Sequence, residues 1–223
     1  MRPMQMHFKP PWAIGQPAPT RDGVRAFHLF AAMAAVGLFF SLSVQASARA
    51  VGRLTIVGDS ISAMSRPELA QALTPRYRVT FDTMVGTFIS TWLGAIQSTT
   101  DTQPKQGWVI ELGTNDTRLN EPGWPTYFHD EVQALSHQPC VVFVTVNPRI
   151  GQASRALDAD IAKAVGNHPN FHSLDWGNIE WQNPKAWLMP DFVHPTPAGS
   201  TKLATLESQT LPADCPHLTG RTS

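Results

Sequence analysis

Five short runs of apolar, strand-forming residues, separated by segments with helical patterning, constrain the fold more than any other feature. The runs occupy residues 53–57, 77–81, 108–112, 141–146 and 171–175. Helices are expected near 66–74, 90–99, 124–137, 153–166 and 197–208. Alternating strands and helices are typical of βαβ units, and near-continuous Val/Ile runs suit strands that are buried on both faces. The sequence therefore predicts a three-layer α/β/α sandwich around a flavodoxin-like parallel sheet of about five strands.

Residues 1–50 differ in composition from the rest, and the folded domain is placed at 51–223. Residues 1–20 hold five prolines and no periodic pattern, which indicates disorder. Arg21 and Arg25 then precede an apolar run at 26–44 and a small-residue stretch at 45–50. This pattern predicts a signal peptide, and the run is also long enough for a membrane anchor. The domain is expected to be secreted or to face the extracytoplasmic side of the cell envelope, with membrane association through 26–44 in the anchored case.

The charge pattern and the cysteines narrow the range of functions. The formal net charge is zero, and no basic patch is present, so a nucleic-acid partner is not expected. Cys140 and Cys215 are the two cysteines, and in an exported protein they predict a disulfide; the alternative is two buried thiols that never meet. Neither cysteine has metal-type spacing and the histidines form no cluster, so we expect neither a metal nor another cofactor.

Polar residues follow the predicted strands at positions suited to a site. In open parallel sheets, ligands bind at the carboxyl ends of the strands. The segments found there are GDSIS (58–62), TMVGT (83–87), GTND (113–116), NPR (147–149) and WGN (176–178), and a DFVHPT turn (191–196) precedes the last helix. The sequence therefore places the candidate chemistry on one edge of the sheet.

Each candidate residue also has an ordinary structural interpretation. Ser60 suits a nucleophile at a strand-to-helix turn, but it also suits a helix N-cap. Gly86 and Asn115 could donate hydrogen bonds to a developing oxyanion, or serve only as turn residues. His194, three residues after Asp191, suits a general base held by a carboxylate, or a surface turn histidine. Only their occurrence together favours the chemical interpretation.

Taken in order, these blocks resemble the SGNH subgroup of the GDSL esterase/lipase superfamily. The matching elements are GDS at 58–60, Gly86, GTND for the family's G-x-N-D and DFVH for its D-x-x-H, spread over residues 53–208. Ile61 replaces the Leu of G-D-S-L. Stretches such as 108–116 and 187–199 are similar to the extracytoplasmic SGNH domains associated with envelope O-acyltransferases. Those domains often carry Gly where this chain has Asp116, which favours hydrolysis over transfer.

The resemblance implies a catalytic set and a reaction. Ser60 would be the nucleophile, His194 the general base and Asp191 its partner, while the Ser60 and Gly86 N–H groups and the Asn115 amide would form the oxyanion hole. The chain is then expected to be an exported serine esterase that removes O-acyl groups, chiefly O-acetyl, from carbohydrate or cell-envelope glycans. One alternative is an O-acetyltransferase that uses the same triad with a membrane acyltransferase partner. Another is a non-catalytic envelope or carbohydrate-binding protein.

Further residues near these blocks are candidates for supporting or substrate-binding roles. Asp59 and Asp116 flank Ser60 and Asn115, and we expect them to hydrogen-bond turn backbone. Arg149 follows the fourth strand and either contacts substrate or is solvated. Tryptophans in loop-rich regions either stack on a sugar or serve packing: Trp124, Trp176, Trp181 and Trp187.

Overall fold

The computed structural model describes residues 52–103 and 105–219. The predicted signal segment, including the apolar run at 26–44, lies outside the described residues. Within 52–103 and 105–219, no helix is both long and apolar enough to cross a membrane.

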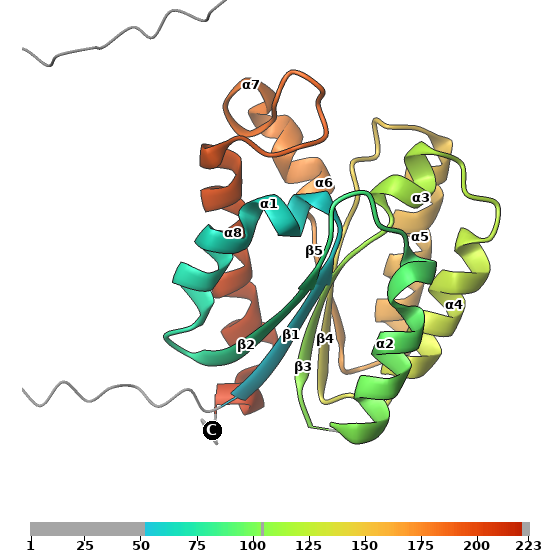
Figure 1. Ribbon diagram of the computed structural model, residues 1–223, viewed down its shortest axis with the longest axis vertical. Coiled ribbons are helices and arrows are strands. Elements are labelled where there is room, and N and C mark those ends of the chain that lie inside the picture. Colours follow the sequence, from blue (N-terminus) through green and yellow to red (C-terminus); the bar gives the residue numbers. More distant parts are fainter. Residues whose placement is uncertain (1–51, 104, 220–223) are drawn as a thin grey trace, which may run out of the picture. The chain divides into compact units, whose positions relative to one another are not determined.

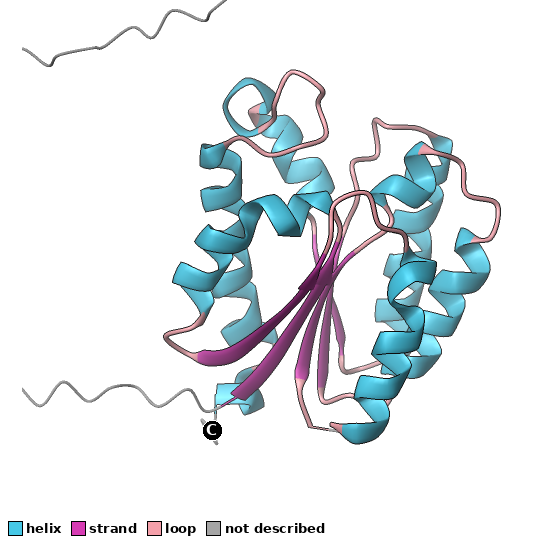
Figure 2. Ribbon diagram, in the orientation of Figure 1, coloured by secondary structure: helices cyan, strands magenta, loops and turns pink. Residues whose placement is uncertain are grey.

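In this part of the chain, five parallel strands form one sheet in the order β2-β1-β3-β4-β5, labelled in Figure 1. Figure 2 shows this sheet between its helices. The strands are β1 (Gly52–Gly58), β2 (Tyr77–Thr83), β3 (Gly107–Glu111), β4 (Cys140–Val144) and β5 (Phe171–Leu174). This confirms the predicted flavodoxin-like sheet. The strand order reverses between β1 and β3, and such a switch point is where open α/β sheets bind ligands.

Helices cover both faces of the sheet, as Figure 1 shows. One face carries α1 (Ser60–Leu73) and α8 (Pro197–Asp214), and the other carries α2 (Ile89–Thr102), α4 (Trp124–Leu135) and α5 (Gln152–Asn167). Short elements complete the chain: α3 (Thr114–Arg118), α6 (Trp176–Ile179), η1 (Glu180–Gln182), α7 (Pro184–Trp187) and η2 (Pro216–Thr219). Two apolar clusters fill the space between the sheet and the helices on its two faces. Leu69 and Leu203 belong to the first cluster, and Ile96 and Leu157 to the second.

Several helix boundaries differ from the prediction. Helix α1 begins at Ser60 rather than at residue 66, because the Asp59 side chain accepts a hydrogen bond from the Ile61 N–H at 2.9 Å and caps it there. Pro67 and Pro212 lie inside α1 and α8, and α8 continues to Asp214 rather than ending at 208. The four- and five-residue helices were not predicted, because they are too short to show a helical period.

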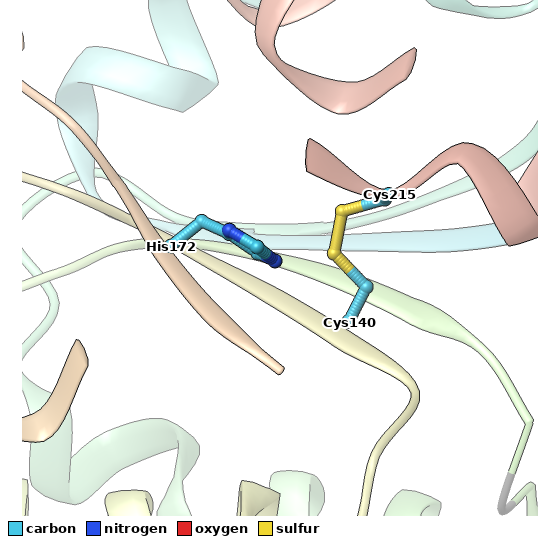
Figure 3. Close-up of side chains that lie close together, drawn as sticks. All are labelled: Cys140, His172 and Cys215. Atoms are coloured by element: carbon cyan, nitrogen blue, oxygen red, sulfur yellow. A yellow bond between two sulfur atoms is a disulfide. The ribbon is translucent and has the colours of Figure 1, made fainter. Parts of the chain in front are cut away.

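A disulfide joins Cys140, the first residue of β4, to Cys215, which follows α8 (Figure 3). It links residues 75 apart in sequence, so closing this loop in the unfolded chain is worth about 4 kcal/mol of stability in the chain-entropy account. The His172 ring from β5 lies beside it, and the three side chains have ligand atoms within 4.8 Å of one another (Figure 3). Because the two sulfurs are bonded to each other, the cysteines hold the C-terminal helix to the sheet.

A buried acid in α4 makes the stability of the domain depend on pH. The Glu131 side chain is 1% exposed and its Oε1 has no hydrogen-bond partner among the described residues. Burial, reinforced by the charge of Asp116, raises the pKa of Glu131 from 4.5 to about 8. The folded state therefore keeps a proton that the unfolded chain releases at lower pH. Between these two values the free energy of unfolding falls as pH rises, by at most about 1.4 kcal/mol per pH unit for one proton.

Glu131→Gln is accordingly expected to flatten the dependence of stability on pH. The amide has the same shape and stays neutral, so the folded state no longer loses stability through this group between pH 5 and 8. Thermal unfolding at the two pH values measures the effect: the drop in Tm should be smaller for the variant than for the parent protein. Equal drops in both proteins would contradict the assignment.

Candidate active site

The ends of β1, β2 and β3 are locked together at the edge of the sheet where the polar segments emerge. The Met84 N–H donates to the Gly58 carbonyl at 3.1 Å, and the Asp59 N–H donates to the Glu111 carbonyl at 3.1 Å. These bonds connect the loop after β1 to both of its neighbours. The loops that carry Ser60, Gly86 and Asn115 therefore share one edge.

A continuous hydrogen-bond chain connects three side chains at this edge. Ser60 Oγ lies 3.0 Å from His194 Nε2, across 134 residues of sequence. His194 Nδ1 lies 2.6 Å from Asp191 Oδ2. The order is that of a nucleophile, a general base and the carboxylate that orients the base.

Ser60 owes its position to a buried cap. It is 3% exposed and is the first residue of α1, so its own N–H has no partner inside the helix. The neighbouring Asp59 is fully buried. Burial raises the pKa of Asp59 to about 7, opposed by the Ile61 N–H hydrogen bond and reinforced by the nearby Asp116 charge. The cap fixes the turn in which Ser60 sits.

Asp191 is arranged to remain ionised. Its Oδ1 accepts the N–H groups of Val193 and His194, both at 3.0 Å, and its Oδ2 faces the imidazole. Its slight burial raises the pKa of Asp191, but the hydrogen bonds from the His194 side chain and backbone and from Val193 outweigh this and lower it to about 2. The carboxylate therefore holds His194 with Nε2 directed at Ser60.

The turn that carries Asp191 and His194 is fastened on both sides. The Met189 N–H donates to the His194 carbonyl at 2.8 Å, and Leu188 forms an antiparallel bridge with Pro195. After the turn, Thr196 caps α8, which begins at Pro197. An imidazole held in this way needs little further ordering to act on the neighbouring hydroxyl.

Gly86 occupies a backbone conformation that other residues avoid. Its φ is +74°, and a Cβ built there would meet nothing within 4 Å. Conformation rather than crowding therefore requires glycine at this exposed position. The Gly86 N–H, like that of Ser60, has no hydrogen-bond partner among the described residues.

Asn115 and Asp116 attach the Gly86 loop to the short helix α3. Asn115 Nδ2 donates to the Thr87 carbonyl at 2.9 Å, which leaves its second amide hydrogen available. The Asp116 carboxylate accepts the Ile89 N–H, the nearer oxygen at 3.2 Å. Burial raises the pKa of Asp116 to about 6, against the effect of this bond. The predicted oxyanion donors therefore belong to segments that hold one another in place.

The aromatic and basic candidates separate into different environments. Trp124 and Trp176 are buried core residues, and Trp187 packs against the Lys202 ammonium, 5.5 Å from the ring centre. The Arg149 guanidinium lies 4.9 Å from the Trp181 ring centre. Arg149 and Trp181 line a cavity of about 400 Å³ that also reaches the Asp191 carboxylate. Its lining includes Arg118, Asn147, Arg149, Trp181, Asp191 and Phe192.

Three of these cavity residues were not predicted from the sequence: Arg118, Asn147 and Phe192. Phe192 lies inside the DFVH block, and Arg118 lies two residues after GTND. Their closeness to recognised blocks is the one signal that could have pointed to them. Their convergence on one cavity depends on loop conformation.

The sequence matches no protein-family model and no curated protein. Solved structures are similar in fold. They include a lipase/acylhydrolase from Enterococcus faecalis (16% identity, 73% of this chain and 96% of that one, TM-score 0.61). A Clostridium thermocellum family 3 carbohydrate esterase also matches, with 16% identity over 75% of this chain and 98% of that one and a TM-score of 0.59. A third match is the C-terminal catalytic domain of Streptococcus pneumoniae peptidoglycan O-acetyltransferase A, solved with a methylsulfonyl adduct. Its identity is 18% over 78% of this chain and 97% of that one, and its TM-score is 0.57. The chain has the fold of these proteins.

Proposed function

We propose that this chain is an SGNH-type serine esterase that hydrolyses O-acyl esters, chiefly O-acetyl esters, on carbohydrate or cell-envelope glycans. The observation that carries the proposal is the contact chain from Ser60 Oγ through the His194 imidazole to Asp191. A serine at a helix start with a base at 3.0 Å, itself held by an ionised carboxylate, is the arrangement that activates a hydroxyl for acyl transfer.

The reaction proceeds in two halves. Ser60 Oγ attacks the ester carbonyl carbon while His194 Nε2 takes its proton, and Asp191 stabilises the imidazolium. His194 then returns the proton to the sugar oxygen, which leaves as an alcohol. In the second half, His194 takes a proton from water, which attacks the acyl-enzyme. Collapse of this second intermediate releases the carboxylic acid and restores the Ser60 hydroxyl.

Three donors are proposed for the oxyanion of the tetrahedral intermediates. They are the N–H groups of Ser60 and Gly86, which have no partner among the described residues, and the second amide hydrogen of Asn115. Donors held in place before reaction stabilise the transition state without reorganisation.

Asn115→Ala is expected to lower kcat about 10²- to 10³-fold, with a smaller effect on KM, since the donor acts on charge that develops during reaction. Steady-state hydrolysis of p-nitrophenyl acetate measures it. A Tm measurement on the same protein shows whether loss of the bond to the Thr87 carbonyl has disturbed the fold. An unchanged kcat in a folded variant would remove Asn115 from the oxyanion hole.

Acyl transfer to a glycan is the second candidate, favoured by the similarity in fold to the catalytic domain of a peptidoglycan O-acetyltransferase. Both reactions share the acyl-enzyme and differ in whether water or a sugar hydroxyl accepts the acyl group. The transfer reaction would need an acyl donor, for which a separate membrane acyltransferase is the proposed partner. The intact contact chain opposes a purely non-catalytic binding role.

The proposed location is outside the cytoplasm, in the envelope or secreted. Two observations support it: the basic, apolar and small-residue pattern of residues 21–50, and the Cys140–Cys215 disulfide. Disulfides form and persist mainly in oxidising compartments.

The proposed function is tested by incubating the purified protein with an O-acetylated glycan and following acetate release and products. Acetate release with loss of acetyl groups from the glycan supports hydrolysis. Acetyl groups appearing on an added glycan acceptor support transfer. If neither the glycan nor p-nitrophenyl acetate is turned over, the esterase proposal fails.

A further inference from the structure

The cavity beside the triad has features of a built binding site. It is formed by the short helix after β3, the loop after β4, and the turn that carries Asp191 and His194. Asp191 is one of its lining residues and contacts His194 directly. A ligand group in this cavity therefore lies beside the carboxylate that contacts the base.

One buried amide holds the aromatic wall of the cavity. Asn147 is 5% exposed; its Oδ1 accepts the Trp181 Nε1–H at 2.5 Å and its Nδ2 donates to the Phe192 carbonyl at 3.2 Å. The Trp181 and Phe192 rings stack at 5.7 Å and 14°. Phe192 is held at φ +56°, and half of its surface is exposed. A large ring kept exposed in a disfavoured conformation suits contact with a ligand such as a sugar ring.

Two exposed arginines line the cavity, and neither forms an ion pair with a described residue. The Arg118 side chain makes no hydrogen bond or ion pair within residues 52–103 and 105–219, and the Arg149 guanidinium lies over Trp181 rather than beside a carboxylate. The one lining carboxylate, Asp191, is engaged by His194. Because both guanidiniums line the same cavity, an anion bound there meets positive charge from two elements. Their planar donor arrays match a carboxylate in two-point hydrogen bonding.

Resting on the proposed esterase function, we propose that Arg118 and Arg149 bind the carboxylate of an acidic sugar, whose ring packs on Phe192, and so direct the enzyme to O-acylated glycans that contain uronic acids. The neighbouring Asp191 charge repels such an anion, and the two guanidiniums outnumber it. The site thereby selects acidic over neutral glycans at the step of binding.

Binding is tested separately from turnover, in full-length Ser60→Ala protein. The probe is unacetylated polygalacturonate, with β-mannan as the neutral comparison, measured by calorimetry or affinity electrophoresis. We expect binding of polygalacturonate only, weakened by added salt. Adding Arg118→Gln or Arg149→Gln should weaken it about tenfold each, as expected for loss of a charged hydrogen bond. Arg78→Gln, which removes an exposed arginine of β2, is the matched control and should leave it unchanged.

Turnover then distinguishes the two proposals. With O-acetylated polygalacturonate, Arg118→Gln and Arg149→Gln should raise KM and leave kcat within about twofold. This is the result expected when the lost contact stabilises the bound substrate and the transition state equally. If polygalacturonate does not bind while p-nitrophenyl acetate is hydrolysed, the carboxylate site is wrong and the esterase stands. If polygalacturonate binds through both arginines but no ester is hydrolysed, the esterase is wrong and the carboxylate site stands. Equal binding of mannan would overturn the selection of acidic sugars.

Discussion

Ser60→Ala is expected to reduce kcat for ester hydrolysis by about 10⁶-fold, the scale seen when a serine nucleophile is removed. The loss is this large because the acyl-enzyme cannot form without Oγ, and the remaining oxyanion donors have only the direct attack of water to assist. The measurement is p-nitrophenyl acetate turnover by extensively purified variant.

Two controls separate this loss from damage to the fold. The one hydrogen bond of Ser60 Oγ within the described residues goes to His194, and Ala leaves the Asp59 cap in place, so the Tm of Ser60→Ala should stay close to that of the parent. Ser136→Ala, at a half-buried position directly after α4, should keep full turnover. Retention of more than about a hundredth of the parent activity in Ser60→Ala would exclude Ser60 as the nucleophile, because removal of the attacking group costs far more than a hundredfold.

Asp191→Asn is expected to lower kcat by about 10⁴-fold, as found for the equivalent change in another serine-hydrolase triad. The amide oxygen can still accept the backbone N–H groups of Val193 and His194, so the turn should persist. An amide nitrogen facing His194 Nδ1 donates instead of accepting, which forces the proton to Nε2. His194 then cannot take the proton of Ser60.

The pH profile gives this prediction a second readout. Because the pKa of Asp191 is about 2, the carboxylate is charged throughout the usual assay range and contributes no inflection of its own there. Loss of activity in Asp191→Asn should therefore persist from pH 5 to 9. Asp101→Asn, an exposed change in α2, should leave the rate unchanged. A variant with more than about a tenth of the parent rate would show that His194 does not depend on Asp191.

The fold was predictable because its main signal is local. Each of the five apolar runs coincides with a strand, since hydrophobic runs between helical segments have few alternatives to a buried parallel sheet. Helix α1 was placed too late because its first turn is serine-rich and its start depends on the Asp59 cap. The helix propensities of the individual residues do not predict a helix start that depends on a side-chain cap of this kind.

In the site, too, residues with a sequence signal could be predicted and residues without one could not. Ser60, Asp191 and His194 could be proposed together because strand ends in a parallel sheet share one edge, and the structure places them in hydrogen-bond contact. The Arg118 and Phe192 positions could not be derived this way. The cavity they line depends on a left-handed residue at Phe192 and on the Asn147 amide, neither of which has a sequence period.

The central claim is that the hydroxyl of Ser60 is activated by His194. Labelling with a fluorophosphonate, followed by intact-mass and peptide mass spectrometry, measures this most directly. We expect one adduct on Ser60 of the parent protein, slow labelling of His194→Ala, and none of Ser60→Ala. An adduct on another residue, or equal labelling of the parent and Ser60→Ala, would contradict it.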